Sequence, residues 1–129
     1  MTNAAASIGH TRWVIPGGRI PATGTGREPD FTSRDELWLL NTGDQEAAIE
    51  VTIYYDEFDP IGPFAITVSA RRVRCVRVND LIDPEAIRLE TNYAAVISSN
   101  VPIVVQVARY DTRQAAQAMS WSMAHPADE

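Results

Sequence analysis

The chain has 129 residues, 45% of them apolar and 22% charged, which suits one compact soluble domain. No apolar run approaches the roughly 20 residues that span a bilayer, and the first residues lack the basic and apolar regions of a signal peptide, so we expect a cytoplasmic protein. All eleven basic residues are arginine and the net charge is −6, which argues against sequence-independent binding of nucleic acid. Cys75 is the only cysteine, which excludes an intrachain disulfide, and we expect a buried thiol.

Alternating apolar and polar residues predict strands in the first half of the chain. The first strand covers residues 8–15, and a loop rich in proline and glycine follows over about residues 16–34. Such a long loop without periodicity suggests ordering by another subunit. Strands at residues 36–41 and 47–55 are separated by Asn41-Thr42-Gly43-Asp44, whose turn chemistry predicts an antiparallel hairpin.

The pattern continues through a turn at residues 59–63 into a strand at 64–68, which extends the meander. Residues 69–81 form the next strand-like stretch, which we call the arginine strand because it holds four arginines. Its apolar residues switch from odd to even positions, and this change of phase predicts a β-bulge near Cys75.

The last third of the chain predicts two strands, at residues 92–99 and 103–110, with a turn between them. The second is apolar on both faces, which is typical of a central strand. Residues 112–118 have the composition of a short helical turn, and residues 119–123 alternate as in a final strand.

Seven or eight short strands at near-regular spacing with little helix predict an all-β fold. We expect a single antiparallel β-sandwich or jelly-roll-like domain over residues 1–129. Its ends, residues 1–7 and 125–129, are expected to be frayed.

The arginine strand points to recognition. A strand built only for burial fills one face with apolar residues, whereas guanidinium groups prefer carboxylate, phosphate or aromatic partners. Alternatively, Arg71 and Arg77 pair with Asp80, Glu85 or Glu90 of a neighbouring subunit and build an oligomer. An exposed tyrosine on the polar face of the strand at 47–55 adds an aromatic platform. The candidate partner- or ligand-binding residues are Arg71, Arg72, Arg74, Arg77, Asn79, Asp80 and Tyr54.

Signals for catalysis are weak. His10 and His125 are the only histidines, and neither lies in a catalytic motif. No zinc spacing, phosphate-cradling glycine loop or dinucleotide fingerprint is present. We therefore expect no enzyme, with no catalytic residues, cofactor or metal. A hydrolase that uses Asp56, Glu57 or Asp59 is the remaining catalytic alternative.

Ten blocks of residues, in order over about residues 8–119, carry a resemblance to a known family. They are residues 9–15, 18–21, 28–31, 40–44, 53–55, 62–64, 70–72, 77–81, 99–106 and 113–115. Together they resemble the sensory rhodopsin transducer family of small soluble proteins. The resemblance implies a β-sandwich that assembles as a homotetramer. It also implies a cytoplasmic partner of a microbial photoreceptor rhodopsin, with DNA binding as a further proposed role.

Two hypotheses for the function follow. In the first, the chain is a non-enzymatic signal-transduction protein whose oligomer presents the arginine strand to an acidic partner. That partner is a membrane photoreceptor or another receptor at its cytoplasmic face, or DNA. In the alternative, the chain is a regulatory β-sandwich module, not linked to rhodopsin, that binds a carbohydrate or an acidic small molecule.

Overall fold

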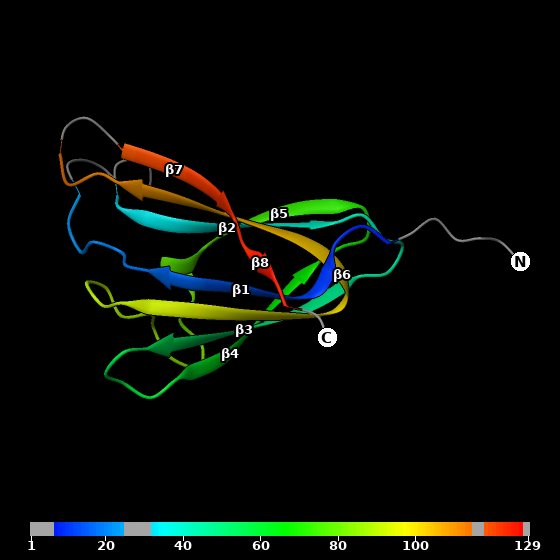
Figure 1. Cartoon of the computed structure of the whole chain (residues 1–129), viewed down its shortest axis with the longest axis horizontal. Helices are drawn as coiled ribbons and strands as arrows, with labels where there is room; N and C mark the ends of the chain where they lie inside the picture. The colour runs from blue at the N-terminus through cyan, green and yellow to red at the C-terminus, as the bar shows by residue number, and fades with distance from the viewer. Residues whose placement is uncertain (1–6, 25–31, 115–117, 128–129) are drawn as a thin grey trace, which may run out of the picture.

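The computed structural model describes residues 7–24, 32–114 and 118–127, and these residues fold as an all-β structure in two layers (Figure 1). The all-β prediction is therefore confirmed. The elements are β1 (His10–Gly18), β2 (Arg34–Asn41), β3 (Ala47–Tyr55), β4 (Ile61–Val68), β5 (Arg72–Arg77), the 3-10 turn η1 (Val78–Asp80), β6 (Tyr93–Asp111), β7 (Ala118–Met123) and β8 (His125–Pro126).

The strands pair in two antiparallel sheets that share β6. Sheet A has the order β4-β3-β6-β1-β8, whereas sheet B consists of β5, β2, β6 and β7. The first half of β6 pairs with β1 and β3, and residues from Val104 onward pair with β2 and β7. In Figure 1, β6 runs from yellow to orange as it passes between the layers.

The two strands predicted at residues 92–99 and 103–110 are one continuous strand, so the predicted turn between them is wrong. Asn100 lies where that turn was expected, and its side-chain oxygen accepts a hydrogen bond from Ala48 N at 2.7 Å. The amide side chain thus ties the middle of β6 to β3, and the chain continues into the second sheet. The central position predicted for residues 103–110 is confirmed, because β6 lies between β2 and β7 in sheet B.

The predicted hairpin between β2 and β3 is also wrong, because these strands lie in different sheets. Asn41 is fully buried between them and holds the crossover. Its Nδ2 donates to the carbonyl oxygens of Gln45 (2.8 Å), Val68 (3.2 Å) and Ser69 (3.3 Å), while its Oδ1 accepts from Gly43 N at 3.0 Å. The turn residues were identified correctly, but they connect two layers instead of two paired strands.

The meander from β3 into β4 and the strand at the arginines are confirmed. The bulge predicted near Cys75 is wrong, because β5 pairs with β2 without a register shift from Arg72 to Arg77. Val73 and Cys75 point to the outer face of sheet B, and Val76 lies on the core side. The apparent change of phase arises because both faces of this sheet carry apolar residues.

The two ends of the chain differ from expectation in part. β8 pairs with Trp13 and Val14 of β1, and Ala127 N donates to Arg12 O at 2.9 Å, so the expected frayed tail is ordered as far as Ala127. The predicted last strand is confirmed as β7, whereas residues 115–117 of the expected helical turn lie outside the described residues.

The same holds for residues 25–31 of the predicted long loop. The described ends of that loop are held within the chain, since Ser33 Oγ donates to Thr23 O at 2.9 Å and Glu90 N donates to Ile20 O at 2.8 Å.

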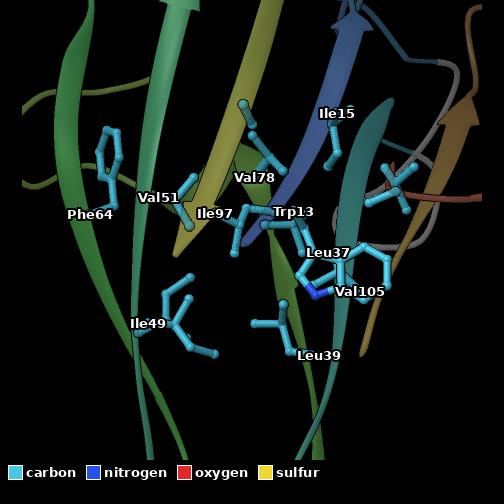
Figure 2. Packing of buried hydrophobic residues seen from close by; sticks show 14 of the residues in the cluster. Trp13, Ile15, Leu37, Leu39, Ile49, Val51, Phe64, Val78, Ile97 and Val105 are labelled. Atoms are coloured by element: carbon cyan, nitrogen blue, oxygen red, sulfur yellow. The ribbon is translucent and has the colours of Figure 1, made fainter. Parts of the chain in front are cut away.

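Alternate residues of both sheets fill the core between the layers (Figure 2). Trp13 packs in its centre, and its indole nitrogen donates to the Ile103 carbonyl at 3.0 Å. The labelled side chains of Figure 2 come from sheet A (Trp13, Ile15, Ile49, Val51, Phe64 and Ile97), from sheet B (Leu37, Leu39 and Val105) and from η1 (Val78).

Replacing Asn41 tests the crossover. Asn41→Ala removes four hydrogen bonds in a buried site and leaves carbonyl groups without donors, so we expect the free energy of unfolding to fall by about 3 kcal/mol. The measurement is urea denaturation. The exposed neighbour change Thr42→Ala serves as the control and is expected to stay within about 0.5 kcal/mol of the wild type. Equal effects of the two changes would contradict the assignment.

Candidate functional site

The four arginines of the arginine strand do not form one surface. Strand alternation sends Arg72 and Arg74 to one side of β5 and Arg77 to the other, while Arg71 precedes the strand with a φ of 57°. Arg71 makes a two-pronged contact with Asp44 Oδ1, at 3.0 Å from Nε and 2.8 Å from Nη2.

The remaining arginines have different partners. Arg77 Nε lies 3.9 Å from Asp80 of the same chain. Arg74 Nη1 donates to Thr67 O of β4 at 2.7 Å, and Arg72 Nη1 donates to Arg71 O at 2.9 Å. Within the described part of the chain, no ion pair joins Arg72 or Arg74 to a carboxylate. Arg74 also bridges the edge strands of the two sheets.

The other predicted site residues lie apart. Asn79 has a structural role, because its Nδ2 donates to Ser33 O at 3.0 Å and its Oδ1 accepts from Asp35 N at 3.4 Å. Asp80 is exposed beside Arg77. Tyr54 is 45% exposed on the outer face of sheet A, beside a shallow groove of about 320 Å³. The structure therefore does not bring Tyr54 together with the arginine strand.

The outer face of sheet B, which we call the sheet B face, is unusually apolar. Trp38 of β2 and Trp121 of β7 stack with ring centroids 5.6 Å apart. Val73, Met119, Met123 and Trp121 are 57%, 52%, 51% and 43% exposed. By register and alternation, one end of the face consists mainly of apolar residues: Trp38, Leu40, Val73, Cys75, Val104, Gln106, Met119, Trp121 and Met123. Arg34, Glu36, Arg77, Ala108 and Tyr110 lie on the same side of the sheet.

Cys75 lies on this face and is exposed, so the expectation of a buried thiol is wrong. Its local desolvation and the neighbouring Glu36 carboxylate raise the pKa of Cys75 to about 11. Glu36 is itself held by Arg34, whose Nε lies 2.8 Å away and whose guanidinium stacks 3.8 Å over the Tyr110 ring. The thiol is thus kept in its unreactive protonated form.

A buried polar cluster that the sequence analysis missed closes one end of the sandwich. Asp35 and Arg109 are cross-strand partners in sheet B, with Arg109 Nε 3.7 Å from Asp35 Oδ2. The Tyr93 hydroxyl of sheet A donates to the same carboxylate, and Arg109 Nη2 donates to the Gly17 carbonyl. The run Arg34-Asp35-Glu36 in a strand pattern was the available signal, since one of those charges had to face the core.

Gly18 makes this cluster possible. A Cβ at Gly18 would lie 2.8 Å from the Tyr93 ring and 3.0 Å from Arg109 Nη2, so only glycine allows both side chains to approach β1. Burial raises the pKa of Asp35, opposed by the hydrogen bond from Tyr93 and the charge of Arg109. Burial and then the Asp35 carboxylate raise the pKa of Tyr93.

A cavity of about 360 Å³, which we call the end cavity, opens above this cluster. Asp35 and Arg109 line the interior side of the cavity, and loops and strand ends form the rest of its wall. The other charged lining residues are Arg19, Glu90, Asp111 and Arg113, and the apolar ones are Pro21, Ala118 and Met119, with Tyr110 and Ser120 completing the wall.

Catalytic and metal chemistry find little support in the described residues. No group of three or more His, Cys, Asp or Glu side chains among them could hold a metal ion. His10 stacks edge-on against Trp13 at 5.5 Å, and the acidic turn of Asp56, Glu57 and Asp59 is exposed. In the same parts of the chain, no helix has the length and apolarity needed to cross a membrane.

The described residues form a β-sandwich with an apolar outer face, exposed arginines at one edge and a charged cavity at one end. The family model described as Anabaena sensory rhodopsin transducer matches residues 8–126, and the chain belongs to this family.

Similar solved structures include the following two. The Anabaena sensory rhodopsin transducer shares 53% identity, with 85% of this chain and 96% of that chain covered and a TM-score of 0.75. A Thermotoga maritima structure, described as that of Thermotoga maritima 1070, shares 25% identity, with coverage of 93% and 97% and a TM-score of 0.78. None of the curated proteins compared matches this chain.

The raised pKa of Asp35 makes stability depend on pH. The folded chain holds this proton more tightly than the unfolded chain, whose value is about 3.8, so the resulting stabilisation is present below that pH and is lost as pH rises through the folded pKa. Asp35→Asn cannot titrate. We therefore expect its free energy of unfolding to increase relative to the wild type with rising pH across this window, as measured by urea denaturation at a series of pH values.

Tyr93→Phe provides the second variant. Removing the phenol donor raises the pKa of Asp35 further, so the window should extend to higher pH. A stability difference between the wild type and Asp35→Asn that does not change with pH would contradict this account.

Proposed function

We propose that this protein is a non-enzymatic signal relay that binds the cytoplasmic side of a microbial membrane photoreceptor. The observation that carries the proposal is 53% identity to the Anabaena sensory rhodopsin transducer across 96% of that chain. A signal passes between proteins through contact surfaces and does not depend on reactive side chains. The described residues offer two surfaces suited to such contacts.

Arg72 and Arg74 form the receptor contact in this proposal. Both are exposed on the edge strand β5, and both bind only carbonyl oxygens within the described chain. Arg71 and Arg77, by contrast, already face Asp44 and Asp80. A carboxylate-bearing partner gains charge-assisted hydrogen bonds with Arg72 and Arg74 without displacing an internal ion pair.

Self-association through the sheet B face completes the proposal, with a homotetramer as the assembly that the family resemblance implies. Four strands of about six residues give the whole face, with its polar residues included, an area on the order of 400 Å². Monomeric proteins rarely expose contiguous patches larger than a few hundred Å². A standard interface buries about 800 Å² from each partner, so this face forms the apolar centre and the surrounding polar residues form the rim.

Receptor binding is tested with the purified chain and a microbial sensory rhodopsin in detergent, at low and moderate salt. We expect the wild type to be retained by the receptor and the Arg72→Ala/Arg74→Ala variant to lose at least about tenfold in affinity, because two charge-assisted contacts are removed. Arg88→Ala/Arg113→Ala is the matched control for net charge. Unchanged retention of the first variant would place the contact elsewhere.

A parallel arm offers double-stranded DNA in place of the receptor. Retention by DNA alone, lost in the Arg72→Ala/Arg74→Ala variant, would replace the receptor proposal with the DNA-binding one. Retention by neither partner would overturn both.

Assembly is tested with Trp121→Glu. A carboxylate beside Trp38 on the sheet B face cannot be desolvated cheaply, so we expect the oligomer to dissociate to monomers in sedimentation analysis. Tyr54→Glu is the control, because Tyr54 is a similarly exposed aromatic residue, at 45% against 43%, on the opposite sheet. Dissociation by Tyr54→Glu and not by Trp121→Glu would assign the interface to sheet A.

A further inference from the structure

The end cavity gathers three arginines, each paired with a carboxylate, in a chain whose net charge is −6. We propose that it binds a small hydroxylated organic anion, whose acid group is held by Arg109 together with Arg19 and Arg113. This inference goes beyond the relay of a receptor signal and rests on different residues. It makes the protein a sensor of a metabolite as well as a partner of a receptor.

Arg109 is the fixed element of this site. Its Nη2 donates to the Gly17 carbonyl, and its Nε lies in the interior, 3.7 Å from the buried Asp35 carboxylate and without a hydrogen-bond partner in the described structure. About a third of the side chain, 35%, remains exposed and lines the cavity. Because contacts on its interior side already fix this guanidinium, it loses little conformational entropy when it binds an anion.

The rim arginines are available for exchange. Arg113 lies 2.6 Å from Asp111 and Arg19 lies 3.5 Å from Glu90, but all four side chains are between 40% and 55% exposed. Arg113 holds Asp111 through both Nε and Nη2, whereas Arg19 contacts Glu90 only once. A solvated single contact of this kind contributes only about 0–1 kcal/mol, so an incoming acid group can replace Glu90 at small cost. The arginines that it meets are already close to their binding positions.

The carboxylates of these rim ion pairs indicate which other groups the ligand carries. The Asp111 and displaced Glu90 carboxylates only accept hydrogen bonds, so they favour a ligand with hydroxyl donors next to the acid group. Pro21 and Met119 provide an apolar wall for the carbon skeleton. The volume of about 360 Å³ lies at the lower end of the range for metabolite sites, which limits the ligand to a few carbon atoms.

Carboxylate and phosphate groups both accept two hydrogen bonds from one guanidinium, so the acid group can come from either source. The test therefore has separate arms. Gluconate supplies a carboxylate with hydroxyls, glycerol 3-phosphate a phosphate with hydroxyls, succinate carboxylates alone and glucose hydroxyls alone.

Titration calorimetry and thermal unfolding of the full chain at low salt measure binding. We expect gluconate or glycerol 3-phosphate to bind and to raise the melting temperature, with succinate weaker and glucose without effect. Arg113→Ala and Arg19→Ala should each raise the dissociation constant by at least about tenfold. Arg71→Ala is the matched control, because Arg71 is exposed and paired with Asp44 at a distance from the cavity.

Binding by none of the four probes would overturn the proposal, as would glucose binding as tightly as gluconate. Equal losses in Arg71→Ala and Arg113→Ala would show general charge attraction and would overturn it too. Receptor retention separates this outcome from the proposed function, because Arg113→Ala should still bind the receptor when its anion binding is lost.

Discussion

The architecture depends on one strand that is hydrogen-bonded on both sides in both layers. β6 pairs with β1 and β3 in sheet A and with β2 and β7 in sheet B. The remaining strands β4, β5 and β8 attach to β3, β2 and β1. The register of β6 therefore sets which residues of every other strand face the core, and Asn100 marks the position where the strand leaves one layer for the next.

The residues of the edge strand β5 alternate between two faces of sheet B. Residues that are neighbours in the sequence therefore lie on two different surfaces. β5 turns Val73 and Cys75 toward the apolar outer face of sheet B and turns Arg72 and Arg74 toward the side where β4 and β5 meet. The self-association and the partner binding that we propose thus use different sides of one short strand. The buried cluster of Asp35, Tyr93 and Arg109 lies at the opposite end of β2. Its charged side chains therefore belong to neither of these two surfaces.

Sequence periodicity predicted most strands because side chains alternate between a buried and an exposed face. It failed at Asn41 and Asn100, where polar side chains with turn-forming chemistry bind backbone groups of other strands, which local sequence does not reveal. It also placed Cys75 wrongly. Because β5 carries apolar residues on both faces, its alternation pattern looked like the change of phase that a bulge produces. The arginine strand was found, but its division between faces and the partnership of Asp35 with Arg109 depend on pairing between strands distant in sequence.

The central position of β6 has a consequence for biosynthesis. β1 has its main pairing partner at residues 93–111, and β2 and β3 complete their pairing there, so one side of each of these strands stays unpaired until most of the chain has left the ribosome. Until then, β3 and β4 form the hairpin available from neighbouring segments. Pairing over such long separations is slow, and the apolar early strands stay open to contacts with other nascent chains. The first half of the chain is therefore more exposed to aggregation during synthesis than the completed fold is.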